Sequence, residues 1–212
     1  MVIDMKTTSS LAGKNISFLG DSITAFNIYQ YRVQELIKAE TINNYGVPGS
    51  TISGNDEISF TKRVSQIDPA SDIVFVFGGT NDFHYNLPLG QILDFPSPDS
   101  YYAGIKLLIQ LLKQQCPKAD IVFATPLQRT MEAENGNNGL NVLGNELKQY
   151  VDALLEVCQS NNVPVIDLYH NSRITVSNAC DYLSDGLHPN DTGLTILAED
   201  IAQGLNNLYA EQ

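Results

Sequence analysis

Short apolar runs rich in β-branched and aromatic residues alternate along the chain with segments of helical periodicity. The runs predict strands at Ile16–Leu19, Thr41–Tyr45, Ile73–Phe77, Ile121–Ala124 and Val163–Leu168. The third and fourth runs are continuously apolar, which is typical of parallel strands buried on both faces. Because strands and helices alternate, the pattern predicts an α/β fold around a parallel sheet.

Helices are predicted between these strands and after the last one. One helix is expected from Tyr29 onward and another after Asp191. Pro117 and Pro164 each stand just before a strand, where they end the preceding helix. The tyrosine pair at 101–102 is expected to pack in the core at a helix start. Apolar residues three or four apart define three buried helix faces: Tyr101, Ile105, Leu108, Ile109 and Leu112; Leu143, Leu147, Tyr150, Val151, Leu154 and Cys158; and Leu194, Leu197, Ile201 and Leu205.

Two long segments, Phe83–Ser100 and Thr125–Gly139, lack periodicity and contain several prolines and glycines. Both follow the carboxyl ends of predicted strands, where open α/β sheets place their binding sites. We therefore expect both loops to be walls or covers of a functional site. The first loop is expected to line either an acyl slot or a sugar-stacking surface with Phe83, Tyr85, Leu87, Leu89, Ile92 and Phe95.

The composition narrows the class of protein. A chain of 212 residues with 43% apolar residues is expected to be one domain, residues 1–212, with residues 1–13 as an N-terminal extension. The net charge of −12 and the absence of any Lys/Arg run longer than Lys62–Arg63 disfavour nucleic acid and anionic membranes as partners. We expect no membrane insertion and a small-molecule partner. Oligomeric state is left open.

The cysteines and the chain start bear on cofactors and location. The 3 cysteines, Cys116, Cys158 and Cys180, have no CxxC spacing, so buried free thiols are expected. No cluster has metal-ligand spacing and no phosphate-binding glycine fingerprint is present, so we expect no metal and no cofactor. Residues 1–14 lack a signal pattern, and we expect a cytoplasmic protein; a secreted one is the alternative if a signal peptide has been removed.

Gly20-Asp21-Ser22 directly follows the first predicted strand. A strand-to-helix turn exposes a serine hydroxyl at the sheet edge and directs backbone N–H groups at the same space, as a nucleophile requires. The alternative is a serine that only caps the next helix. Taken alone, a tripeptide of turn residues favours that alternative.

Asp185-Gly186-Leu187-His188-Pro189 near the C-terminus is more specific. A histidine acts as a base only if its second nitrogen is held in one tautomer, and a carboxylate three residues upstream can reach Nδ1. Pro189 restricts His188 to an extended conformation. A solvated surface loop is the alternative. His84 and His170, by contrast, are interpreted as lacking carboxylate partners at a motif spacing.

Two further segments could supply oxyanion donors. Asn81, in Gly79-Thr80-Asn81-Asp82, could direct its side-chain amide at a developing oxyanion, and Gly49 could add its backbone N–H. The alternatives are a β-turn and a plain loop. These alternatives become less convincing because both segments follow predicted strands and lie on the same sheet edge as Ser22.

Together these four segments resemble blocks I, II, III and V of the SGNH (GDSL-type) hydrolases, in the family's order, over Ile16 to about Leu205. Isoleucine (Ile23) stands where the family often has leucine. The resemblance implies a flavodoxin-like three-layer α/β/α sandwich with a five-stranded parallel sheet of order 2-1-3-4-5. It implies Ser22 as nucleophile, His188 as general base and acid, and Asp185 as its orienting carboxylate. The Ser22 and Gly49 N–H groups and the Asn81 amide would form the oxyanion hole.

Asp21, Asp82 and His84 are weaker candidates for substrate contact. Asp21 is better explained as fixing the turn, and Asp82 either braces its loop or is solvated. The expected activity is cofactor-independent hydrolysis of a carboxylic ester through an acyl-enzyme, on a short acyl group carried by a carbohydrate or other small molecule. The alternatives are a lysophospholipase or thioesterase, an acyltransferase, or a non-catalytic glycan-binding module on the same fold.

Overall fold

A computed structural model describes residues 11–131 and 139–210. Its parallel sheet has the strand order β2-β1-β3-β4-β5. The strands are β1 (Asn15–Gly20), β2 (Thr41–Gly46), β3 (Ile73–Phe77), β4 (Asp120–Ala124) and β5 (Val165–Ile166). The order reverses beside β1, so the carboxyl ends of β1 and β3 flank the crevice where such sheets bind ligands. The predicted α/β class and strand order are confirmed.

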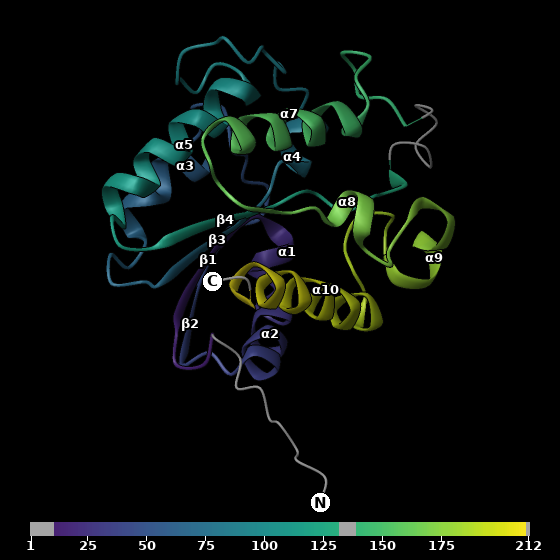
Figure 1. Cartoon of the computed structure of the whole chain (residues 1–212). Coiled ribbons are helices and arrows are strands. Elements are labelled where there is room, and N and C mark those ends of the chain that lie inside the picture. The colour runs from purple at the N-terminus through teal and green to yellow at the C-terminus, as the bar shows by residue number, and fades with distance from the viewer. Residues whose placement is uncertain (1–10, 132–138, 211–212) are drawn as a thin grey trace, which may run out of the picture.

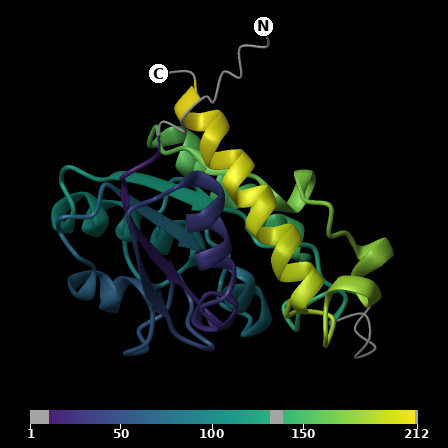
Figure 2. The same ribbon diagram turned by 90° about the horizontal axis from the view of Figure 1, so that it is seen from below.

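Helices cover both faces of this sheet, giving three layers (Figure 1). On one face lie α2 (Tyr29–Ile37) and α10 (Asp191–Ala210), which pack against each other, as Figure 2 shows from below. On the other face lie α3 (Phe60–Arg63), α5 (Tyr101–Gln115) and α7 (Leu147–Ser160). Shorter helices sit in the connections: α1 (Ser22–Ala25), η1 (Val64–Gln66), α4 (Thr80–His84), α8 (Leu168–Asn171), η2 (Val176–Asn178) and α9 (Ala179–Tyr182).

The sheet is held by two apolar cores, one on each face. Strand β3 is buried along its whole length, and its side chains alternate between the two cores. Phe75 packs toward α2 and α10, while Val74 and Val76 pack toward α5 and α7. Each such side chain contributes about 1.5–3 kcal/mol of burial free energy. A rigid central strand therefore fixes the loop that follows it.

Several predicted boundaries differ from the structure. The fifth strand is only Val165–Ile166, because the chain turns into α8 at Leu168. The helix whose predicted buried face starts at Leu143 is α7, which begins at Leu147. Leu143 lies exposed in the preceding turn. Leu11, in the predicted extension 1–13, is buried in the core. All three cysteines are free thiols, but Cys180 is exposed, so the expectation of burial is wrong for that residue.

The loop from 85 to 100 is fastened to α5. The Lys106 ammonium donates to the carbonyls of Ile92 and Asp94, and the Tyr101 N–H donates to the carbonyl of Pro88 at 2.8 Å. Phe83 lies in the core and Phe95 is 89% exposed, so these two side chains do not line one common surface. Of the second long loop, residues 132–138 lie outside the described part of the chain.

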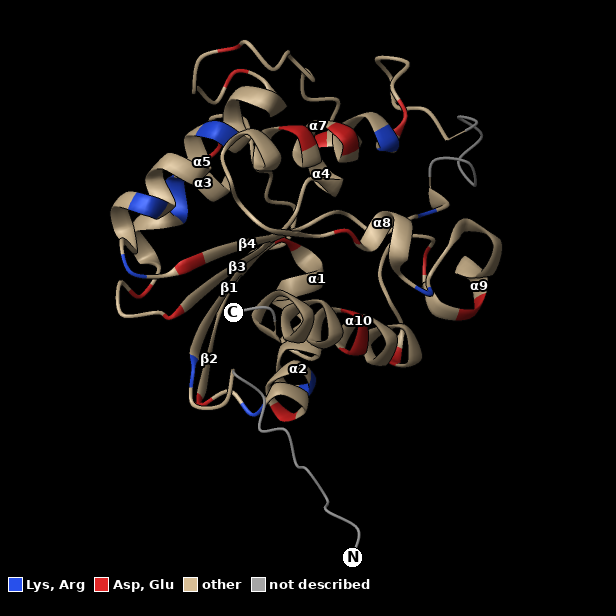
Figure 3. Ribbon diagram, viewed as in Figure 1, with Lys and Arg blue, Asp and Glu red and all other residues tan. Residues whose placement is uncertain are grey.

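Charged residues are spread over many elements. Figure 3 shows lysine and arginine placed singly or in pairs on α2, α3, α5 and α7, and acidic residues on α7, α9 and α10. In residues 11–131 and 139–210, no helix is long and apolar enough to cross a membrane.

Candidate active site

Ser22 begins the short helix α1 directly after β1. The Asp21 carboxylate caps this helix, because its Oδ1 accepts a hydrogen bond from the Ile23 N–H at 3.0 Å. Ser22 therefore occupies the first helical position, where a backbone N–H has no partner within the helix. Its side chain is half-buried, with the hydroxyl at the carboxyl edge of the sheet. This is a suitable position for a nucleophile.

His188 lies across from Ser22 although 166 residues separate them in sequence. Its Nε2 is 2.9 Å from the Ser22 Oγ, and its Nδ1 is 2.7 Å from Oδ2 of Asp185. The other carboxylate oxygen of Asp185 accepts from the N–H groups of Leu187 and His188. The structure thus brings together the serine, histidine and aspartate that the sequence predicted to act as one site.

The same bonds keep Asp185 ionised. Partial burial acts to raise the pKa of its carboxyl, but the hydrogen bonds from the backbone and ring of His188 outweigh it and lower the pKa below its usual range. A carboxylate at Nδ1 fixes the tautomer in which Nε2 can accept a proton from Ser22. The loop can therefore orient the ring as a base.

The predicted oxyanion donors lie in two neighbouring loops. Gly49 has a φ of +74°, a left-handed conformation that favours glycine. Asn81 is the second residue of α4 and is buried, and its Nδ2 donates to the carbonyl of Ser50 at 2.9 Å. The Asn81 amide is thus held beside the residue that follows Gly49. Both predicted donors lie next to each other in space.

Asp82 braces this arrangement. It is fully buried, and its carboxylate accepts from the Ile52 N–H and from both the N–H and hydroxyl of Ser53. Burial raises its pKa to about 6, against the effect of these bonds. Of the two readings of Asp82, bracing therefore fits and solvation does not. Asp82 and Asp21 both lie behind the site, so substrate contact, the weaker prediction for them, does not fit a buried carboxylate.

His84 and Arg129 lie side by side in the connections that follow β3 and β4. Arg129 is buried, donates to the carbonyl and hydroxyl of Thr80, and has Nη2 3.4 Å from the Nδ1 of His84. Burial and the Arg129 charge both lower the pKa of His84. His84 also packs edge-on against Tyr85, with ring centroids 5.0 Å apart. The two long segments that were predicted to border a functional site therefore meet where His84 contacts Arg129.

Comparison with known proteins decides the family. A family model described as the GDSL-like lipase/acylhydrolase family matches residues 18–196. The chain belongs to this family. An isoamyl acetate-hydrolyzing esterase 1 homolog of Mus musculus is 25% identical over 197 residues, covering 87% of this chain and 78% of that protein.

Solved structures resemble this chain along nearly its whole length. A protein from Lactobacillus plantarum is 27% identical with a TM-score of 0.85, covering 93% of this chain and 99% of that one. An acetyl xylan esterase is 19% identical with a TM-score of 0.65, covering 90% and 99% of the two chains, a likeness of fold alone. The predicted SGNH/GDSL resemblance is confirmed, and with it an esterase or acylhydrolase family.

Two features of this chain were missed in the sequence. Phe26 is half-exposed and its ring lies edge-on to His188, with centroids 5.5 Å apart. His170 does have a carboxylate partner, because its Nδ1 is 2.7 Å from Oδ2 of Asp167, three residues upstream. The earlier interpretation of His170 was therefore wrong. The spacing is the same as that of Asp185 and His188, and it was visible in the sequence.

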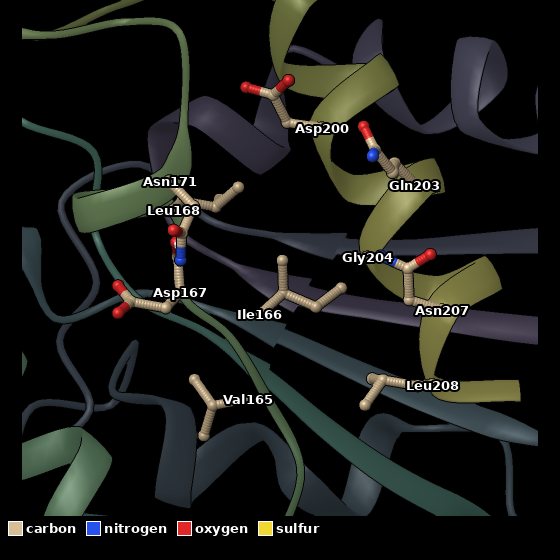
Figure 4. Close-up of a pocket in the computed structure, with 10 residues that line it drawn as sticks. All are labelled: Val165, Ile166, Asp167, Leu168, Asn171, Asp200, Gln203, Gly204, Asn207 and Leu208. Atoms are coloured by element: carbon tan, nitrogen blue, oxygen red, sulfur yellow. Dashed lines mark hydrogen bonds between the residues drawn. The ribbon is translucent and has the colours of Figure 1, made fainter. Parts of the chain in front are cut away.

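A cavity of about 450 Å³ lies away from Ser22, between β5, α8 and α10 (Figure 4). Ile166 and Leu208 contribute apolar lining, and Asp167 and Asp200 contribute carboxylates. Both carboxylates are already bonded, Asp167 to His170 and Asp200 to Ser172 and Arg173. Within the described ranges, no group of three or more His, Cys, Asp or Glu side chains could hold a metal ion.

Proposed function

We propose that this chain is a serine esterase in which Ser22, His188 and Asp185 form a catalytic triad. The observation that carries the proposal is the continuous chain of short contacts, 2.9 Å from Ser22 to His188 and 2.7 Å from His188 to Asp185. A nucleophile, a base within hydrogen-bond reach and a third group that orients the base are the parts that acyl transfer requires.

The reaction then runs in two halves. The Ser22 Oγ attacks the acyl carbonyl while its proton passes to His188 Nε2, and the carbonyl electrons move onto oxygen. Gly49, Asn81 and the Ser22 N–H stabilise that oxyanion. When the carbon–oxygen bond of the leaving alcohol breaks, His188 returns the proton to it, leaving an acyl-Ser22. A water deprotonated by His188 releases the acid by the same steps.

The substrate we propose carries a short acyl group on a carbohydrate or other small molecule. The supporting observation is Tyr85, whose hydroxyl would lie 3.3 Å from a methyl group placed on Gly49. A half-exposed tyrosine against the oxyanion loop restricts the space beside the reacting carbonyl. The name of one relative, an isoamyl acetate-hydrolyzing esterase 1 homolog, points to acetyl esters as well.

The test is initial rates on p-nitrophenyl acetate, butyrate and octanoate. Acetate or butyrate should be turned over fastest, and Ser22→Ala and His188→Ala should each lower kcat by several orders of magnitude. Ser160→Ala, an exposed serine on α7, and His170→Ala, whose ring is paired with Asp167, are the matched controls.

Near-native turnover by either site variant would overturn the triad. A rate that is highest on octanoate would overturn the short-acyl assignment, since each methylene in a fitted pocket changes the rate about tenfold or more. Product analysis with added alcohols distinguishes hydrolysis from transfer to an alcohol.

A further inference from the structure

Arg63 is an unusual residue for the interior of this fold. It is the last residue of α3, only 4% exposed, and its guanidinium stacks over the ring of Phe60 at 5.3 Å. Neither the family motifs nor the catalytic steps above include it. Its surroundings nevertheless place it behind the loops that carry all the proposed oxyanion donors.

The guanidinium donates hydrogen bonds in four directions. Its Nη2 bonds the carbonyl of Gly20 at 3.1 Å and the hydroxyl of Ser50 at 3.0 Å. Its Nη1 bonds the carbonyl of Tyr45 at 2.6 Å, and its Nε bonds the carbonyl of Ile58 at 2.8 Å. The fork of one side chain thus joins the end of β1, the end of β2 and the loops after β2.

These acceptors are close in sequence to the oxyanion donors. Gly20 lies two residues before Ser22, and Ser50 directly follows Gly49. The Gly20 carbonyl also accepts from the Val47 N–H at 3.1 Å, which ties the same two loops together. Any shift of the guanidinium would therefore move the backbone of Ser22 and that of Gly49.

Ser50 extends the connection to the third donor. Its hydroxyl accepts from Arg63, and its carbonyl accepts from the Asn81 Nδ2 at 2.9 Å. The chain of bonds runs from the guanidinium through Ser50 to the amide of Asn81. A single buried cation therefore contacts, directly or through one residue, the segments that hold all three donors.

Space filling alone does not account for a cation here. Burying a charge costs free energy, and well-packed apolar residues often replace buried ionic groups without loss of stability. Burial lowers the pKa of Arg63 to about 10, against the effect of the Asp21 carboxyl, so the side chain remains charged at neutral pH. What an apolar side chain lacks is the rigid set of directed donors that fixes carbonyl positions.

We propose that Arg63 is a positioning residue that sets the geometry of the oxyanion hole. The inference rests on the proposed function, because it assigns Arg63 to the stabilisation of the same tetrahedral intermediate. A displacement of about 1 Å at a reacting centre costs about 100-fold in rate, and removal of one oxyanion donor costs about 100- to 1000-fold. Loosening the hole should therefore reduce transition-state binding while leaving substrate binding nearly unchanged.

The test compares wild type with Arg63→Lys, which keeps the positive charge and loses the planar set of guanidinium N–H donors. Rates are divided by the concentration of active sites, titrated with a chromogenic organophosphate, so that a smaller folded fraction does not count as slower catalysis. We expect kcat to fall about 10- to 100-fold with KM changed less than about threefold. Affinity for phenylboronic acid, which forms a tetrahedral anion on a reactive serine, should fall in parallel.

Arg173→Lys is the matched control. The Arg173 guanidinium is also multiply bonded, to Glu199, Asp200 and the carbonyl of Ile196, but it lies on the surface. Its kcat and boronate affinity should equal those of wild type. Methylguanidinium at millimolar concentration should partly restore kcat to Arg63→Ala, as a role through the directed donors requires.

Wild-type kcat per active site and wild-type boronate affinity in Arg63→Lys would overturn the proposal. If Arg63→Lys folds too poorly to assay, Ser50→Ala decides, since it removes the hydroxyl that accepts from the Arg63 Nη2 and that donates to the carbonyls of Val47 and Gly20 in the same two loops. A loss of both kcat and boronate affinity supports the proposal, and no change in either overturns it. Failure of the proposed function is distinct, because it appears as full activity in Ser22→Ala with Arg63 intact.

Discussion

Asp21 offers a test of the electrostatics beneath the nucleophile. Its carboxyl is 1% exposed, and this burial raises its pKa to about 7. The hydrogen bond from the Ile23 N–H and the charges of His188 and Arg129 act to lower the pKa, whereas the nearby Asp82 acts to raise it further. Asp21→Asn keeps the size of the side chain and an oxygen to accept from Ile23. It removes only the ability to ionise.

The sign of the effect follows from proton binding. The pKa is about 7 in the folded chain and 3.8 in the reference state, so between these pH values the folded chain holds a proton that the unfolded chain has released. The free energy of unfolding therefore falls as pH rises through this window. At about 1.4 kcal/mol per pH unit, the full cost of ionising Asp21 is about 4 kcal/mol, of which about 3 kcal/mol falls between pH 4.5 and 8.

Urea denaturation of wild type and Asp21→Asn at a series of pH values measures this cost. The stability of the variant relative to wild type should improve by about 3 kcal/mol from pH 4.5 to pH 8. Asp56→Asn, an exposed aspartate, should show no such trend. A difference between wild type and Asp21→Asn that stays constant with pH would refute the reasoning.

Two further changes test the loops around the site. Asn81→Ala removes one proposed oxyanion donor and should lower kcat about 100- to 1000-fold with little change in KM, measured by steady-state kinetics on p-nitrophenyl acetate; an unchanged kcat would exclude Asn81 from the hole. Gly79→Ala places a methyl group 2.2 Å from the buried Tyr101 hydroxyl at a φ of +102°, so it should destabilise the fold by at least about 2 kcal/mol. Thermal denaturation measures the Gly79→Ala effect, with Gly144→Ala as the control, because Gly144 also has a positive φ, +78°, but no atom near an added methyl group. Equal losses of stability in the two glycine variants would contradict a role for the Tyr101 contact.

Local patterns in the sequence were enough to predict the α/β class and the first four strands, whereas the sheet order came from the family resemblance. Strand β3 coincides with the predicted run Ile73–Phe77 because continuous burial on both faces demands continuous apolar sequence. Strand β5 was overestimated because Asp167 begins a helical turn instead of continuing the strand. Its side chain caps α8, an alternative that apolar periodicity cannot detect.

Local sequence also determined the pairing of Asp185 with His188, since both belong to one loop and a three-residue spacing brings carboxylate and ring together. The same spacing pairs Asp167 with His170 at the same 2.7 Å. Sequence alone cannot say which histidine has a serine within reach. Only the fold, by placing His188 2.9 Å from Ser22 across 166 residues, makes that distinction.

Tertiary structure likewise decided which charged groups are buried. Asp21, Arg63 and Asp82 are polar residues in short connections, and their local sequence is equally typical of solvated turns. Their burial depends on loops that meet only after β1, β2 and β3 have aligned in the sheet. The sequence by itself determined which elements form and which local pairs can act, because these depend on neighbours along the chain. The environment of each group, and with it the oxyanion geometry, depends on residues distant in sequence and was decided only by the folded structure.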